Sequence, residues 1–441
     1  MIICKILLFN TIILVLLKEV IYLELKIPVI DIVLSLSSAI DLIDPRITNH
    51  HKRVSYIAYS IAKEMNLSDE EIKNLILASL LHDCGAVNLS ERNSLFEFEF
   101  LESMLNRYSH GYKGWFILNE ASELKAAAEI IKFHHVFWEE RLESHLQVYK
   151  IPITSFILHL ADRVDILINR NKEILNQRTY IQNMINSGSG TMFMPSTVDA
   201  FNNLVQKPYF WFDIINPYLD DLIKKAMLHY NSYINNSSFH QYANIAHRII
   251  DFRSRFTSTH SMGVATSSSA LADKMGFSVL DTELMKSAGL MHDLGKLCIP
   301  EYILEKPGPL DKNEFNIIKS HTYHTYRILN SITGLEKVQD WAAFHHEKLD
   351  GTGYPFQLNA NQLDLGSRIM AVADMFTALI EDRPYRPAKP VEYAMDMINS
   401  SKNLDYDVKA CLNQNLEEIL QKTKASQENV TICCHEIFET P

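Results

Sequence analysis

The feature that most constrains the fold of this chain is an internal repeat marked by histidines. Histidine occupies only 18 of 441 positions, yet the histidine-containing segments occur twice in the same order. HHKRV at His50 is matched by HSMGV at His260, and LLHDCGA is matched by LMHDLGK. Self-similarity at one fixed offset indicates that the chain contains two copies of one structural unit.

The other landmarks keep the same register. SHGYKGWFIL is matched by SHTYHTYRIL, KFHHVFW by AFHHEKL, and LHLADRVDIL by MAVADMFTAL. Corresponding residues lie 210 to 212 positions apart throughout. The landmarks of the first copy are His50, His82, Asp83, His110, His134, His135 and Asp162, and those of the second copy are His260, His292, Asp293, His321, His345, His346 and Asp374. We therefore interpret the chain as a tandem duplication.

The segments between the landmarks have helical periodicity. Apolar residues recur on one helical face, as at Val54, Ile57 and Ile61, and few segments alternate in the way that strands do. Ser68 and Ser278 then precede a new helix in each copy, at the position where serine caps a helix. The sequence therefore predicts an all-α fold of two tandem helical bundles.

The domain boundary is expected at the polar stretch 235–238, because Asn and Ser clusters interrupt periodic segments. This divides the chain into an apolar N-terminal extension at 1–25, a first copy at 26–235 and a second copy at 236–441. The apolar run at 6–17 is only about half the length that crosses a bilayer. We interpret it as an extra docked helix or an over-extended start rather than a membrane anchor.

Composition excludes some classes of protein. Acidic residues outnumber basic residues by 53 to 42, and the resulting net charge of −11 disfavours binding to a nucleic-acid polymer. The six cysteines include no CxxC pair, which favours reduced thiols in a cytoplasmic protein over a disulfide scaffold.

Histidines and aspartates in this number indicate a metal site in each copy. Imidazole together with carboxylate suits Fe, Mn, Zn or Ni, and the absence of a cysteine set argues against a closed structural zinc site. In the adjacent His-Asp pair, both side chains can point into a site between helices, and the aspartate can bridge two metals. One such histidine alone would be interpreted as a hydrogen-bonded core residue, but a seven-residue set repeated in register favours metal binding.

The second copy resembles the HD-domain phosphohydrolases, and in particular the HD-GYP subfamily, which hydrolyses cyclic di-GMP. The residues that carry the resemblance are His260, HDLGK at 292–296, His321, HHEKLDGTGYP at 345–355 and Asp374. The resemblance is close over about residues 240–400. Residues 30–230 resemble the same HD fold with the landmarks only.

The resemblance implies a phosphodiesterase of bacterial second-messenger signalling with a bimetallic site. One metal would be held by His260, His292, Asp293 and Asp374, and the other by Asp293, His321, His345 and His346. The two divalent ions, Fe or Mn, would share Asp293, and a hydroxide bridging them would attack phosphorus in line. Cyclic di-GMP would then be converted to pGpG or GMP.

Further residues would bind the substrate if the resemblance holds. Lys296 would stabilise negative charge at the scissile phosphate. Gly351 and Gly353 tolerate positive φ, and the loop would shape the substrate-binding edge of the site through Gly351, Gly353, Tyr354 and Pro355. Arg383 and Arg386 would bind the phosphates of the dinucleotide. Two alternatives stay open: hydrolysis of another cyclic dinucleotide such as 3′,3′-cyclic GMP-AMP, and a non-catalytic cyclic-dinucleotide sensor.

The sequence departs from the family pattern at one position of the second copy. Some members bind a third metal through a glutamate at the position of Phe256, so we expect two metals here.

The first copy departs further. Ala86 stands in place of the lysine, no GYP follows His135, and Asn171 and Ile174 stand opposite the two arginines. We interpret this copy as a degenerate HD domain that binds metal in a regulatory or structural role, with a second active site of different specificity as the alternative. Beside the landmarks, His51, Cys84 and His324 are interpreted as bystanders. The two copies could pair within one chain or across a homodimer.

Overall fold

A computed structural model describes most of the chain. The described residues are 25–44, 48–86, 104–143, 146–147, 149–230, 232–253, 258–382 and 387–438. Four of the sequence predictions therefore concern residues outside the described part of the chain: the N-terminal extension (except Leu25), Phe256, Arg383 and Arg386.

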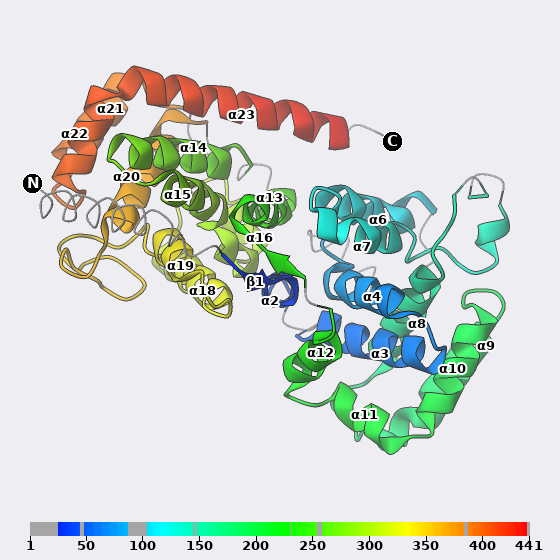
Figure 1. The fold of residues 1–441 in the computed structure, drawn as a ribbon. Helices are drawn as coiled ribbons and strands as arrows, with labels where there is room; N and C mark the ends of the chain where they lie inside the picture. Colours follow the sequence, from blue (N-terminus) through cyan, green and yellow to red (C-terminus); the bar gives the residue numbers. More distant parts are fainter. Residues whose placement is uncertain are drawn as a thin grey trace, which may run out of the picture.

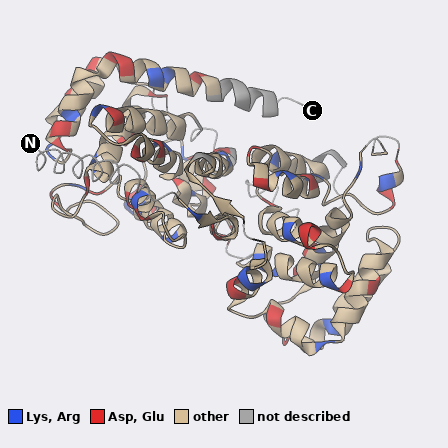
Figure 2. Cartoon of the chain, viewed as in Figure 1, with Lys and Arg blue, Asp and Glu red and all other residues tan. Residues whose placement is uncertain are grey.

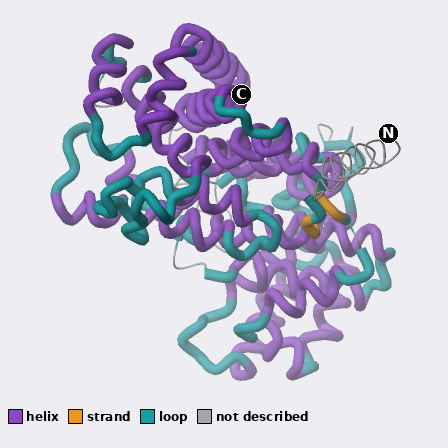
Figure 3. Tube along the Cα trace, turned by 60° about the vertical axis from the view of Figure 1, so that its left-hand side comes forward, coloured by secondary structure: helices purple, strands orange, loops and turns teal. Residues whose placement is uncertain are grey.

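The described residues confirm the prediction of an all-α fold (Figures 1 and 3). The helices of the first copy that carry or surround its landmarks are α2 (Val29–Asp41), α3 (His50–Glu64), α4 (Asp69–Leu81), α6 (Met104–Leu118), α7 (Lys125–Lys132) and α8 (Ile153–Leu167). They are followed by α9 (Arg178–Ser187), α10 (Pro195–Val205), α11 (Pro208–Ile214) and α12 (Leu219–Met227).

The second copy repeats the order of the helices that carry the landmarks. Its elements are α13 (Asn236–Arg253), α14 (Ser258–Lys274), α15 (Val279–Met291), the 3₁₀ turn η5 (Leu294–Cys298), α16 (Glu301–Leu304), α17 (Lys312–Ile318), α18 (Ser320–Leu329), α19 (Glu336–Ala343), α20 (Leu365–Ile380), α21 (Val391–Ser400), α22 (Tyr406–Gln414) and α23 (Leu416–Phe438). The expected boundary at 235–238 falls where α13 begins.

Equivalent helices of the two copies begin and pack in the same way. The side chain of Ser68 caps α4 in a capping box with Glu71, and that of Ser278 caps α15 by accepting from the backbone of Asp281. In the first copy α3 packs against α4 and α8, and in the second α14 packs against α15 and α20. Each central helix therefore has its first landmark histidine beside the helix that carries the last aspartate.

The two copies also pack against each other through their first helices, which lie between the two lobes (Figure 1). From α2, Ser35 Oγ donates to the carbonyl of Ile328 on α18, at 2.8 Å. From α13, Arg248 pairs with Glu120 just beyond α6 and covers the ring of Phe116. The first helix of each copy thus contacts the helix of the other copy that carries the third landmark histidine, α18 for α2 and α6 for α13, and the copies are paired within one chain.

Two short strands, which the sequence did not indicate, join the ends of the first copy. They are β1 (Ile27–Pro28) and β2 (Tyr233–Ile234), paired antiparallel. Acidic and basic residues are interspersed over both lobes (Figure 2). Among the described helices, none combines the length and the apolar character needed to cross a membrane.

Candidate metal centres

The second copy brings its seven landmark residues together from five places in the fold. His260 lies on α14, His292 and Asp293 follow the end of α15, and His321 lies on α18. His345 and His346 follow the end of α19, and Asp374 lies on α20. Their ligand atoms form three groups within 4.8 Å, namely His260/His292/Asp374, His292/Asp293/His345 and His321/His345/His346.

Asp293 lies between the two ends of this cluster. Its Oδ2 is 3.2 Å from His292 Nε2 and 4.0 Å from His260 Nε2. Its Oδ1 faces the other way and is 3.5 Å from His321 Nε2. Each carboxylate oxygen is therefore directed at a different group of histidines, as a bridging ligand requires.

Backbone carbonyls fix the protonation of the histidine rings. His292, His321 and His345 each place Nδ1 against the carbonyl three residues earlier in the chain, at 2.7, 2.6 and 2.8 Å respectively. A carbonyl can only accept, so each Nδ1 carries the proton and each Nε2 presents its lone pair to the cluster. Metal-ligating histidines are commonly oriented in this way.

Two of these lone pairs face each other. His321 Nε2 lies 3.3 Å from His345 Nε2, and burial lowers the pKa of each ring to about 3, so both are neutral. Two acceptor nitrogens at this separation repel unless a cation lies between them. His292 Nε2 is also buried without a hydrogen-bond partner among the described residues. The donor set therefore fits divalent metal ions, and these His/Asp clusters could bind them.

The carboxylates of the cluster are held in their anionic form. Burial opposes the ionisation of Asp293, but His292 and Lys296 outweigh it and hold the pKa of this carboxyl well below its usual range. The Nζ of Lys296, on η5, lies 2.6 Å from Asp293 Oδ2. The predicted lysine is therefore at the cluster, in contact with the central carboxylate.

Glu381 is a buried carboxylate at this site that the sequence pattern did not identify. Its Oε1 lies 2.8 Å from Nδ1 of His260, on the side of the ring opposite the cluster. It follows the end of α20 and is seven residues after Asp374, about two helical turns along the same face. That spacing is the only sequence signal by which it could have been found.

The GYP loop lies against the cluster. The Tyr354 ring centroid is 5.0 Å from that of His346, and Gly351 has a positive φ, at 76°. Gly353 does not use the positive φ that glycine tolerates. A Cβ at Gly353 would instead lie 2.5 Å from the backbone of Glu347, so close packing requires glycine there.

Glu347 organises the exit of this loop. Its buried carboxylate accepts from the backbone N–H groups of Phe356 and Gln357, at 2.6 and 3.1 Å, and from that of Leu358 at 3.0 Å. The sequence pattern contains this glutamate but gave no indication of its role.

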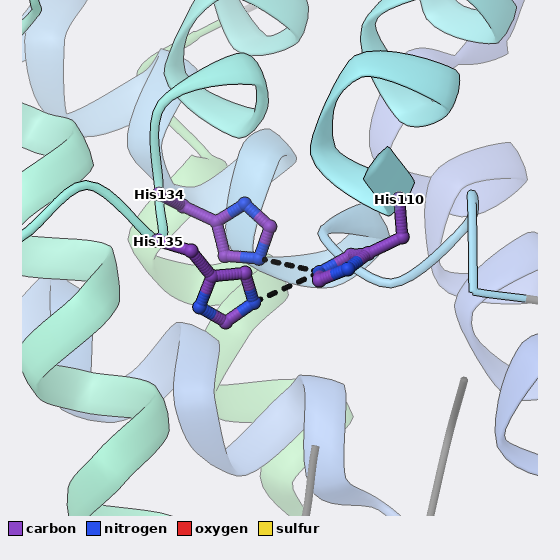
Figure 4. A group of neighbouring side chains, drawn as sticks. All are labelled: His110, His134 and His135. Carbon is purple, nitrogen blue, oxygen red and sulfur yellow. Dashed lines mark hydrogen bonds between the residues drawn. The ribbon is translucent and has the colours of Figure 1, made fainter. Parts of the chain in front are cut away.

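The first copy gathers its own seven landmarks in a similar arrangement. His50, His82 and Asp83 form one group within 4.8 Å, and His110, His134 and His135 form another. In Figure 4 the rings of His134 and His135 both point at the ring of His110, with Nε2 separations of 3.3 and 2.8 Å. His82 and His134 again donate Nδ1–H to the carbonyl three residues earlier.

The surroundings of the first cluster differ from those of the second. His50 Nδ1 lies 2.7 Å from the carboxylate of Asp165. Asp165 is three residues after Asp162, whereas Glu381 is seven residues after Asp374, so the two carboxylates are not at equivalent positions. Arg163 is buried and binds Asp162 Oδ2 at 2.6 Å. Ile174, opposite one of the arginines of the second copy, is buried in the core.

Two of the residues interpreted as bystanders are fully buried. His51 is hydrogen-bonded to Asp41, and its Nε2 lies 3.7 Å from Asp83 Oδ2. Cys84 is buried in the hydrophobic core and His324 is half-buried.

Comparison with known proteins places both clusters in recognised domains. Models described as HD domain match residues 47–167 and 244–410. The 3′3′-cGAMP-specific phosphodiesterase 1 of Vibrio cholerae is 31% identical over 404 residues, which cover 88% of this chain and 91% of the relative. The 3′3′-cGAMP-specific phosphodiesterase 3 of the same organism is 25% identical, with 86% and 92% covered.

Other relatives match in part or in fold. A cyclic di-GMP phosphodiesterase of Thermotoga maritima is 37% identical over 158 residues, or 35% of this chain and 43% of the relative. The crystal structure of a cyclic GMP-AMP-specific phosphodiesterase of V. cholerae, V-cGAP3, shares the fold with a TM-score of 0.62 at 23% identity, covering 89% of this chain and 98% of that one. The chain belongs to the HD-domain family and carries two HD copies in tandem.

Proposed function

We propose that this protein is a metal-dependent phosphodiesterase that hydrolyses a cyclic dinucleotide at the second HD copy. The observation that carries the proposal is the convergence of seven ligand residues with Lys296 against the central carboxylate of Asp293. Relatives named as cyclic-dinucleotide phosphodiesterases support it. The GTGYP loop beside His346 supports assignment of this copy to the HD-GYP subfamily.

The relatives favour 3′,3′-cyclic GMP-AMP over cyclic di-GMP as the substrate. The two that cover most of this chain are named as specific for 3′3′-cGAMP, whereas the cyclic di-GMP phosphodiesterase of T. maritima matches only 35% of the chain. We therefore propose 3′,3′-cyclic GMP-AMP as the preferred substrate and cyclic di-GMP as the second candidate.

The residues of the second copy divide into two ligand sets around Asp293. We assign His260, His292, Asp293 and Asp374 to one divalent ion, and Asp293, His321, His345 and His346 to a second, with Fe or Mn as the expected metals. Bound ions would supply the Lewis acidity and water activation that phosphodiester hydrolysis requires. The neutral imidazoles of His321 and His345 and the ionised carboxylate of Asp293 leave these donor atoms ready to bind.

The partial exposure of two ligands gives a substrate access to this cluster. The side chains of His346 and Asp374 retain 33% and 14% of their exposed surface. A phosphodiester entering there would pass Tyr354 and reach the ammonium of Lys296, which can stabilise charge developing on a phosphoryl oxygen. Arg383 and Arg386 lie two and five residues beyond Glu381 in the sequence, and we assign them to binding of the dinucleotide phosphates.

The full chain, purified without oxygen and loaded with Fe or Mn, tests this proposal. We expect chromatography to show linearisation of 3′,3′-cyclic GMP-AMP, with slower turnover of cyclic di-GMP. Binding of either dinucleotide without turnover by metal-loaded protein would favour the alternative of a non-catalytic sensor. Faster turnover of cyclic di-GMP would contradict the substrate assignment while leaving the reaction class intact.

For the first copy we propose metal binding without hydrolysis. It has Ala86 at the position of Lys296, and its residues opposite the two arginines are Asn171 and Ile174. The side chain of Asp162 is only 3% exposed, against 14% for Asp374. The cluster therefore keeps ligand atoms but has lost both the substrate-binding residues and the access that the second copy has.

A further inference from the structure

A buried histidine–aspartate pair lies next to the His50, His82 and Asp83 group of the first copy. His51 on α3 is 0% exposed and Asp41 at the end of α2 is 5% exposed. His51 Nδ1 is hydrogen-bonded to the Asp41 carboxylate, so this nitrogen carries the proton. His51 Nε2 is buried and has no hydrogen-bond partner among the described residues.

This unpartnered nitrogen is directed at the centre of the cluster. The Nε2 atoms of three histidines approach the same oxygen, Asp83 Oδ2, from 3.9 Å for His50, 3.7 Å for His51 and 3.5 Å for His82. Their ring centroids lie 4.9 to 5.3 Å apart. Three imidazoles arranged around one carboxylate oxygen can bind one metal ion together with it.

The second copy differs at the sequence position of His51. Ser261 occupies the position of His51, and the ammonium of Lys296 lies 2.6 Å from the equivalent oxygen, Asp293 Oδ2. In the first copy the lysine position is Ala86. The first copy therefore places an imidazole beside this carboxylate oxygen, whereas the second copy places an ammonium there.

The supporting carboxylate is common to both copies, but its histidine is not. Asp41 and Asp251 are 210 residues apart, and Asp251 Oδ2 lies 3.0 Å from Nε2 of His247 on its own helix, α13. The position of His247 is Ser37 in the first copy. The histidine has thus exchanged places with a serine in the sequence of the two copies.

We propose that His51, oriented by Asp41, is an additional metal ligand that closes the first-copy site. The ion would be held by His50, His51, His82, Asp83 and Asp162. A carboxylate that holds the distal nitrogen of a ligating histidine is the common way to orient such a ligand. This inference deepens the proposed role of the first copy, because a site filled by protein ligands is structural, whereas a catalytic site keeps a position open for water or substrate.

The environment of Asp162 agrees with a closed site. Arg163 binds Asp162 Oδ2, while Oδ1 remains directed at His50 Nε2, at 3.3 Å. The carboxylate therefore offers one oxygen to an ion and cannot bind it through both. Because Arg163 occupies Asp162 Oδ2, His51 Nε2 would supply the additional donor atom for the ion.

Binding of Co²⁺ to the full-length, metal-stripped chain tests the proposal. We compare wild type with His51→Ser, which introduces the residue found in the second copy, and with His229→Ser, a control at an exposed histidine. His82→Ala defines the signal lost when the first-copy ion is lost. We expect His51→Ser to weaken the binding of that ion by about 100-fold and to change the visible absorption spectrum of the bound Co²⁺. Cyclic-dinucleotide turnover should stay within about twofold of wild type.

Asp41→Asn is the second variant, because it keeps the size of both side chains should His51→Ser fail to fold by circular dichroism. We expect it to weaken Co²⁺ binding by about 10-fold to 100-fold. The proposal is overturned if His51→Ser and Asp41→Asn bind Co²⁺ with the affinity and spectrum of His229→Ser. It is also overturned if wild type and His82→Ala bind the same number of ions. Turnover is measured separately, so failure of the second-copy phosphodiesterase would be recognised independently.

Discussion

The glycine of the HDLGK segment provides a sharp test of how the second cluster is built. Gly295 lies against α18, and a Cβ at this position would be 1.9 Å from the carbonyl oxygen of His321 and 2.7 Å from the backbone nitrogen of Thr325. Because side-chain carbons do not approach backbone atoms closer than 3.0 Å, alanine requires η5 and α18 to separate by roughly 1 Å.

That separation would act directly on His321, one of the proposed metal ligands. Gly295 N–H donates to Thr325 Oγ1 at 2.9 Å, and Thr325 Oγ1 donates to the carbonyl of His292 at 3.0 Å, so α18 is tied to the HD turn. Moving α18 carries His321 away from Asp293 and His345. We expect Gly295→Ala to cost about 1–3 kcal/mol of stability and to lower turnover by about 100-fold.

The assay combines elemental analysis with turnover, and Gly308→Ala is the matched control because a Cβ there meets nothing within 4 Å. We expect Gly295→Ala to lose the ion assigned to His321, His345 and His346 while Gly308→Ala keeps it. The reasoning is refuted if Gly295→Ala retains its full metal content and turns over substrate within twofold of Gly308→Ala. Gly85 has the same relation to His110 in the first copy, with a Cβ 2.1 Å from its carbonyl oxygen.

Two further predictions concern the ligand histidines. Glu381→Gln removes the charge beside His260 and should weaken Mn²⁺ binding by about 10-fold to 100-fold in calorimetric titration. Glu392→Gln is the control, and equal Mn²⁺ affinities of the two variants would contradict the role assigned to Glu381. Burial lowers the pKa of His321 and His345 from 6.5 to about 3, so the unfolded chain binds more protons between those values. The free energy of unfolding of the metal-free protein should therefore fall as the pH drops from 6.5 toward 3, by up to about 1.4 kcal/mol per pH unit for each ring. Urea unfolding measures this free energy, and equal values at pH 7 and pH 5 would contradict the prediction.

The sequence predicted which histidines and aspartates would cluster because they recur in register. The repeat identifies side chains that both copies retain, and the structure brings all fourteen into two clusters. The all-α fold was predictable for a similar reason, since helical periodicity and the caps at Ser68 and Ser278 are local signals.

The residues that support the ligands could not be predicted in this way. Glu381 and Asp165 serve the same purpose from different positions, so alignment of the copies does not pair them. His51 and His247 have exchanged places with serines, and the repeat therefore hides them. Pairing of the copies through α2 and α13 depends on tertiary contacts, such as that of Ser35, which leave no periodic pattern.

The central claim is that the second copy alone is catalytic, and turnover by a pair of matched variants tests it most directly. Asp293→Asn and Asp83→Asn change the equivalent carboxylate in each copy without changing its size. With 3′,3′-cyclic GMP-AMP as substrate and folding verified by circular dichroism, we expect Asp293→Asn to lose turnover and Asp83→Asn to retain it within a few-fold of wild type. Loss of turnover in a folded Asp83→Asn protein, or its retention in Asp293→Asn, would contradict the account.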